Sequence, residues 1–85
     1  MNPHLRRALM LLQQERHELA AQELRQALVD TPNDAMSHAV LALCLSSNKQ
    51  YDEATAEAET AIHLQPDQPF AFYALSVVLR ARNRF

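Results

Sequence analysis

The feature that most constrains this chain is an internal repeat with a period of about 34 residues. Pro32 recurs as Pro66, and Leu11 recurs as Leu45. Four further pairs share the same offset: Ala20 and Ala54, Ala27 and Ala61, Ala8 and Ala42, and His4 and His38. Self-similarity at a fixed period of about 20 to 50 residues is typical of stacked supersecondary units. The 85 residues therefore hold two complete units and part of a third.

Each unit has the apolar spacing of two helices. Leu5, Leu9 and Leu12 follow one another at intervals of three or four residues, which is helical periodicity. The chain has no glycine and is rich in alanine and leucine, a composition that favours helix throughout. The expected fold is all-α with five helices, at about 3–14, 17–29, 35–47, 51–64 and 68–82.

Residues that start or stop helices lie between the predicted helices. Asn48, within the break at residues 47–50, is the residue expected to take a left-handed turn, because no glycine is available there. Asn2, Asp34 and Asp67 precede helix starts. Their side-chain oxygens are expected to accept hydrogen bonds from the free N–H groups of the first turn.

These residues resemble the signature of the tetratricopeptide repeat family, W-x2-L-G-x2-Y, then A-x3-F, then P. The second unit is the best match and reads His38-x2-Leu41-Ala42-x2-Leu45, then Ala54-x3-Ala58, then Pro66. The other two units depart further: His4-x2-Arg7-Ala8-x2-Leu11, Ala20-x3-Leu24 and Pro32 in the first, and Phe72-x2-Leu75-Ser76-x2-Leu79 in the third. Arg7, where the family favours leucine, fits an N-terminal end with no preceding repeat to pack against.

The resemblance implies a right-handed solenoid of paired helices, about two and a half helix-turn-helix repeats in one domain. The first repeat spans residues 1–34, the second 35–68 and the partial third 69–85. An ordinary small helical bundle with coincidental alanine spacing is the alternative, and the shared offset favours the repeat. Because the third unit lacks its second helix, the chain is expected to be a fragment of a longer array.

The first helix of each repeat lines a concave groove in this family, so the resemblance implies which residues face that groove. They are Leu5, Leu9, Leu12, Met36, Ala39, Val40, Leu43, Phe70, Tyr73 and Val77. Such a surface is mainly apolar, and it suits a helix or an apolar stretch of a partner protein. The expected function is that of a protein-interaction scaffold.

Two interpretations stay open for part of this set. Leu5, Leu9, Val40 and Leu43 suit contact with a ligand and also suit packing against a neighbouring helix. The better candidates for ligand contact lie near helix starts and are larger than close packing requires: Met36, Phe70 and Tyr73.

One branch of the family grips the C-terminal carboxylate of a chaperone with lysine, asparagine and arginine side chains. The corresponding residues here are Leu5, Leu9, Val40, Phe70 and Ala74. None of their side chains donates a hydrogen bond to a carboxylate. Binding of a chaperone tail is therefore not expected.

The end of the third unit suggests a second function. Leu75, Val78 and Leu79 are expected on the face that a following second helix would cover. Exposed apolar surface on a terminal helix predicts self-association, here a homodimer of the isolated chain through its last helix. The alternative to a partner-binding scaffold is thus a structural segment that assembles through this helix.

Charge and reactive residues point to no other class of function. The net charge of −2 gives no broad reason to expect nucleic acid, and Arg80, Arg82 and Arg84 suit the dipole of a helix end. The four histidines, His4, His17, His38 and His63, lack the spacing of a local metal site. No cofactor and no catalytic site is expected.

Location follows from the remaining features. Cys44 is the only cysteine, so it cannot form an internal disulfide, and its place among leucines suits an inert core residue. No apolar run approaches the roughly 20 residues of a membrane span. The expected location is the cytoplasm, with no membrane contact by this segment.

Overall fold

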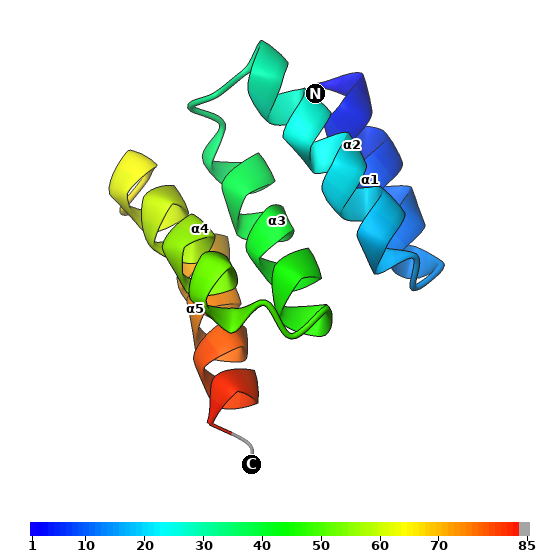
Figure 1. The fold of residues 1–85 in the computed structure, drawn as a ribbon. Helices are drawn as coiled ribbons and strands as arrows, with labels where there is room; N and C mark the ends of the chain where they lie inside the picture. Colours follow the sequence, from blue (N-terminus) through cyan, green and yellow to red (C-terminus); the bar gives the residue numbers. More distant parts are fainter. Residues whose placement is uncertain (84–85) are drawn as a thin grey trace.

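The computed structural model describes residues 1–83, and it is built from five helices (Figure 1). They are α1 (Pro3–Gln13), α2 (His17–Asp30), α3 (Ala35–Ser47), α4 (Tyr51–Leu64) and α5 (Pro69–Arg82). No strand occurs among the described residues, so the expected all-α fold is confirmed. Arg84, the third arginine of the predicted basic cluster, and Phe85 lie outside the described residues.

The helices pack as two antiparallel pairs followed by a single helix (Figure 1). α1 packs against α2, and α3 packs against α4. α2 also contacts α3, which joins the two pairs, and α5 packs against both α3 and α4. The arrangement agrees with the repeat read from the sequence, while the right-handed sense of the solenoid stays a prediction.

Fully buried alanines lie within both pairs at equivalent places. They are Ala8, Ala20 and Ala27 in the first repeat, and Ala42, Ala54 and Ala61 in the second. A methyl side chain lets two helix axes approach closely, and a larger one at the contact would hold them apart. The constant offset between these alanines thus records the same close helix contact built twice.

α3 is the central helix of the molecule and buries nine of its 13 residues. Neighbours cover it on several sides, so its apolar residues are not confined to one stripe. The larger part of the core joins α1 to α4 and also takes in Val78 of α5. A smaller part lies where α3, α4 and α5 meet, and consists of Ala39, Ala61, Ala71 and Ala74.

Only one of the three predicted helix caps forms as expected. The side-chain oxygen of Asn2 accepts a hydrogen bond from the backbone N–H two residues on, at 2.8 Å. Asp34 precedes α3, but its carboxylate accepts the hydroxyl of Ser37 at 2.6 Å and caps no backbone N–H. α5 is preceded directly by Gln68, so Asp67 is one residue too early to be the cap.

The turn inside each complete repeat uses a left-handed residue at the same place. Glu15 has φ 58° and Lys49 has φ 63°. In both turns the next N–H reaches back to a helix carbonyl at 2.9 Å, that of Leu11 or Leu45, which is a Schellman ending. Asn48 has φ −92° because its N–H still bonds to carbonyls of α3. The predicted left-handed position was therefore wrong by one residue.

Replacing Lys49 with glycine is expected to raise the free energy of unfolding by about 0.5 to 1 kcal/mol, because glycine adopts positive φ without a Cβ clash. Asn48→Gly, at negative φ, is expected to lower the same quantity. Urea denaturation of both variants beside the wild type measures the difference. A gain with Asn48→Gly and none with Lys49→Gly would contradict this account of the turn.

Candidate functional site

The helices α1, α3 and α5 share a set of apolar side chains that stay partly or largely exposed, most of them packing in part against the core. We call this set the first-helix face, and it consists of Leu9, Leu12, Met36, Leu43, Phe70, Tyr73 and Val77. Six of these side chains are half-buried, and Tyr73 is 56% exposed. One row crosses all three helices at the repeat offset and contains Leu9, Leu43 and Val77. All seven residues were predicted to line the groove.

A second row lies seven residues nearer the helix starts and contains Met36 and Phe70. The equivalent residue in α1 is Asn2, whose side chain caps that helix. The ring of Phe70 lies 5.9 Å from that of Tyr73, tilted by 37°. Seven residues of helix span about 10 Å, so two apolar rows run across the face about 10 Å apart.

Three of the ten predicted groove residues are buried and offer a partner no surface. Leu5 is 4% exposed, Val40 is 1% exposed and Ala39 is fully buried. Leu5 and Val40 belong to the larger core cluster and Ala39 to the smaller one. The sequence left open whether Leu5 and Val40 contact a ligand or pack against a neighbouring helix, and in the structure both pack in the core. These three residues are therefore not part of the candidate site.

The spacing of the first helices is uneven. α1 stands farther from α3 than α5 does. Between α3 and α5 the contact is made by small residues, Ala39, Ala71 and Ala74, whereas α1 presents Leu9 and Leu12 to the core. Larger side chains hold helix axes farther apart, so the first-helix face is wider on its α1 side.

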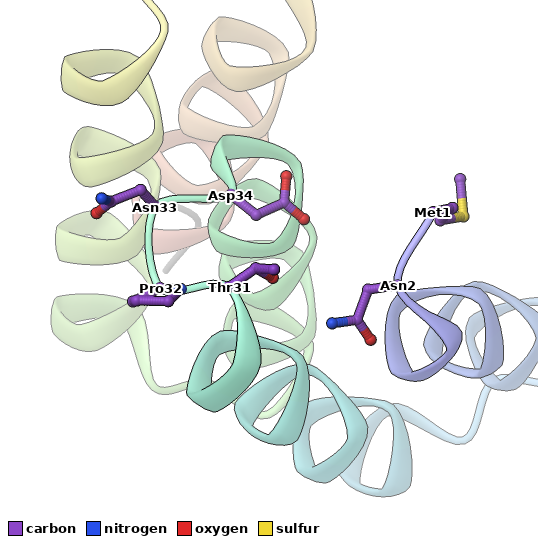
Figure 2. Close-up of a pocket in the computed structure, with 6 residues that line it drawn as sticks. All are labelled: Met1, Asn2, Thr31, Pro32, Asn33 and Asp34. Carbon is purple, nitrogen blue, oxygen red and sulfur yellow. The ribbon is translucent and has the colours of Figure 1, made fainter.

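Several hollows of the surface lie away from the first-helix face. Figure 2 shows one of about 500 Å³ between the start of the chain and the turn from α2 to α3. It is lined by Met1, Asn2, Thr31, Pro32, Asn33 and Asp34. The Thr31 hydroxyl donates to the carbonyl of Ala27 at 2.9 Å, and the Asp34 carboxylate is held by Ser37. These polar groups serve the helix ends and do not converge on a ligand.

Two smaller hollows of about 170 Å³ each also lie away from the first-helix face. One is lined by residues of α2, α3 and the turn after α3, and the other lies between α1 and α2. The candidate site is therefore an open apolar surface and not one of these cavities. Such a surface suits a protein segment better than a small molecule, which needs an enclosing pocket.

The histidines at the repeat's signature position are used within the helix pairs. Nδ1 of His38 lies 2.6 Å from a carboxylate oxygen of Glu57 in α4, and its Nε2 lies 2.8 Å from the carbonyl oxygen of Pro32. The equivalent His4 lies 3.4 Å from Glu23 of α2. No group of three potential metal-ligand side chains gathers anywhere in residues 1–83.

Arg7 faces the second helix of its own repeat. Its counterpart one repeat later is Leu41, which is buried in the core cluster that includes α4, and its guanidinium pairs with Glu23 of α2. This hydrogen bond, with a smaller contribution from His4, holds the pKa of Glu23 below its ordinary value of 4.5. Arg7 thus takes part in an ion pair within the first repeat.

Cys44 is a packing residue. Its thiol is 1% exposed, and burial raises its pKa to about 11. A thiol with so high a pKa stays protonated near neutral pH, and it is the thiolate that acts as nucleophile or metal ligand. The side chain therefore contributes apolar contacts.

The three residues predicted for self-association differ in exposure. Val78 is fully buried in the larger core cluster, so its assignment to an open face was wrong. Leu75 is half-buried and Leu79 is 38% exposed. Phe72, which the prediction omitted, is 51% exposed on the same helix. It holds the signature position of His38 one repeat later, and this equivalence was the signal that could have identified it.

Comparison with known proteins agrees with the fold. Within the described residues, no helix has both the length and the apolar character needed to cross a membrane. No curated protein and no solved structure matches the chain. A family model described as tetratricopeptide repeat matches residues 11–78, which include all of α2, α3 and α4 and most of α5. The chain therefore belongs to the tetratricopeptide repeat family.

Proposed function

We propose that this chain is a protein-interaction scaffold whose first-helix face binds an apolar helical segment of a partner protein. Tetratricopeptide repeats generally mediate protein–protein interaction. The observation that carries the proposal is the set of seven apolar side chains left half-buried or exposed on one face, with Tyr73 56% exposed. Contiguous exposed apolar surface of this kind marks interaction sites.

The dimensions of the face favour a helix as ligand. Packed helices lie about 8–10 Å apart, and α1 stands farther from α3 than α5 does, so the face is at least roughly 20 Å wide between the outer axes. The two apolar rows lie about 10 Å apart, close to the 10–12 Å diameter of a helix with its side chains. An amphipathic helix of about 13 residues spans this width and presents apolar residues to both rows. An extended segment of about six residues also spans it but reaches only one row at a time.

We propose binding without catalysis, in the cytoplasm. The buried, protonated Cys44 thiol and the pairing of His4 and His38 within the fold leave no reactive group on the first-helix face. A single buried thiol suits a reducing compartment. The net charge of −2 supports a protein ligand over nucleic acid.

A second candidate function is structural and consists of self-assembly through the last helix. The observation that favours it is the exposure of Phe72 and Leu79 on α5, 51% and 38%. This surface lies on a different side of α5 from Tyr73, because consecutive residues of a helix point about 100° apart. The two candidates therefore predict different effects for neighbouring aromatic residues.

The test of peptide binding uses phage-displayed peptides selected on the wild-type chain, with Tyr73→Lys as the variant. Losing a large aromatic anchor from an interface costs about 2 kcal/mol or more, so the selected peptides are expected to bind Tyr73→Lys at least about 30-fold more weakly. Fluorescence polarisation of labelled peptides measures the Kd. Tyr73 is exposed, so circular dichroism should show unchanged helicity.

Phe72→Lys is the matched control, since Phe72 is an equally exposed aromatic residue next in the chain. Selected peptides are expected to bind Phe72→Lys as they bind the wild type. If instead Phe72→Lys abolishes binding and Tyr73→Lys does not, the peptides bind the other side of α5 and the proposed site is wrong.

A further inference from the structure

Among the described residues, one side of α5 lacks the cover that its counterpart in α3 has one repeat earlier. In α3, Leu41, Ala42 and Leu45 are 2%, 0% and 1% exposed, and α4 is the helix paired with α3 there. Their counterparts one repeat later are Leu75, which is half-buried, Ser76, which is exposed, and Leu79, which is 38% exposed. Side chains at equivalent positions are therefore buried on α3 and partly or largely exposed to water on α5.

Phe72 extends this open surface by one helical turn. It occupies the position of His38, which in α3 is held by Glu57 of α4 at 2.6 Å. In α5 the residue is instead apolar and 51% exposed, so a partner at this position is expected to present apolar side chains where α4 presents the Glu57 carboxylate to His38. We call Phe72, Leu75, Ser76 and Leu79 the open face of α5. Leu75 packs in part against the larger core cluster, whereas Phe72, Ser76 and Leu79 are exposed within residues 1–83. The helices that pack against α5 are α3 and α4 (Figure 1).

We propose that a second copy of this chain covers the open face, with the two α5 helices packed antiparallel about a two-fold axis. This inference rests on the second candidate function, self-assembly, and is independent of peptide binding. A second copy is the expected partner because the open faces of two copies fit each other in one antiparallel register.

The complementarity follows from the order of side chains along the open face. Phe72 precedes Leu75 by three residues, and Leu79 follows Ser76 by three. When a second α5 runs antiparallel about a point between residues 75 and 76, Phe72 lies opposite Leu79 of the second copy. Leu75 then lies opposite Ser76 of the second copy, so a large side chain meets a small one at the centre. Small residues at a helix crossing permit close approach.

Charges at the two ends of α5 favour the same direction. Asp67 precedes the start of the helix, and Arg80 and Arg82 lie in its last turn. Within one chain, Arg82 lies 3.4 Å from the Asp52 carboxylate of α4 and Arg80 donates to the Ser76 hydroxyl at 3.3 Å. In an antiparallel pair the arginine end of one helix lies beside the Asp67 end of the other, and the helix dipoles oppose one another. A parallel pair would instead bring arginines against arginines. The antiparallel arrangement is thus favoured by the charges as well as by the apolar side chains.

The size of the surface sets the expected strength. A helix of 14 residues is about 21 Å long, and a pair of such faces lies at or below the roughly 1,200 Å² lower limit of standard stable interfaces. We therefore expect a dimer that dissociates on dilution between roughly 1 mM and roughly 1 µM. Light scattering coupled to gel filtration should show the mass fall, on dilution, from that of two chains to that of one chain.

Ser76→Glu is the variant that tests the surface. Ser76 is exposed and outside the core, and a glutamate there can pair with Arg80 one turn later, which preserves the helix. In the dimer the same glutamate meets Leu75 of the second copy and lies near its own symmetry mate, so the dimer should be lost. Leu19→Glu, at an exposed leucine of α2, is the matched control and should leave the dimer intact.

Cysteine pairs test the register and do not depend on the glutamate variant. Phe72→Cys mixed with Leu79→Cys is expected to give a mixed disulfide on mild oxidation, because these residues face each other across the axis. Phe72→Cys alone should cross-link poorly, since residues seven apart lie about 10 Å apart along the helix, beyond the reach of about 7 Å for a disulfide. The native Cys44 is buried and does not compete.

The outcomes separate this inference from peptide binding. A mass of one chain at every concentration, or a dimer that persists in folded Ser76→Glu, would overturn it, and so would efficient cross-linking of Phe72→Cys with itself. Loss of the dimer in Phe72→Lys but not in Tyr73→Lys would support it. The same two variants also show whether peptide binding fails separately, because of these two residues only Tyr73 belongs to the first-helix face.

Discussion

Leu45→Ala is expected to lower the free energy of unfolding by about 2–5 kcal/mol, the largest effect of any single substitution considered for this chain. Leu45 is 1% exposed near the C-terminal end of α3, within the larger core cluster. Removing its isobutyl group both loses apolar burial and leaves a cavity that close neighbours fill only in part. A domain of this size is stable by about 4–13 kcal/mol in total, so urea denaturation should show the midpoint fall by a large fraction.

The repeat supplies two matched controls for that substitution. Leu11 and Leu79 hold the same position in the neighbouring units, and they are half-buried and 38% exposed. Leu11→Ala should cost less than Leu45→Ala, and Leu79→Ala should cost least when measured at low micromolar concentration. Equal costs at all three positions would mean that burial in this structure does not govern their contribution.

Ala42→Leu is expected to destabilise the fold by about 1–3 kcal/mol or more, because the added carbons have no space between α3 and α4. Ala42 is fully buried in the same core cluster as the small residues Ala54 and Ala58 of the next helix. The larger side chain must push the helix axes apart or take a strained rotamer. Thermal unfolding followed by circular dichroism should show a lower Tm.

Ser76→Leu is the control, since Ser76 is the counterpart of Ala42 in α5 and is exposed. This substitution should change stability little in the monomer. If Ala42→Leu proves neutral, the close contact of α3 and α4 is more adaptable than alanine packing implies. A large loss with Ser76→Leu would show that this side of α5 is covered within one chain, contrary to the open face described above.

The two surfaces of α5 connect these results to function. Tyr73 points to the first-helix face and Phe72 to the open face of α5, and each is more than half exposed. One helix therefore serves two proposed contacts, one with a partner segment and one with a second copy. Neither contact requires the other, so a chain held as a dimer would present two first-helix faces and gain avidity for a partner with two binding segments.

Local periodicity determined most of the fold in advance. The helical spacing of Leu5, Leu9 and Leu12 and the constant offset between repeats predicted five helices. The helix bounds found in the structure differ from the predicted ones by one residue at most. Repeated alanines predicted the close contacts within each pair, because only small side chains permit them. These features depend on residues near one another in the chain, and so they could be read from the sequence.

What only the tertiary structure decided was which side of each helix ends up covered. Spacing along a helix gives a side chain's direction but not the neighbour it meets, so Leu5, Ala39 and Val40 lie in the core and Tyr73 does not. Val78 is buried and Phe72 is exposed for the same reason: α3 and α4 pack against one side of α5 and nothing described packs against the other. Burial is a property of helix pairs, and the positions of helices from different repeats are set by packing over the whole chain.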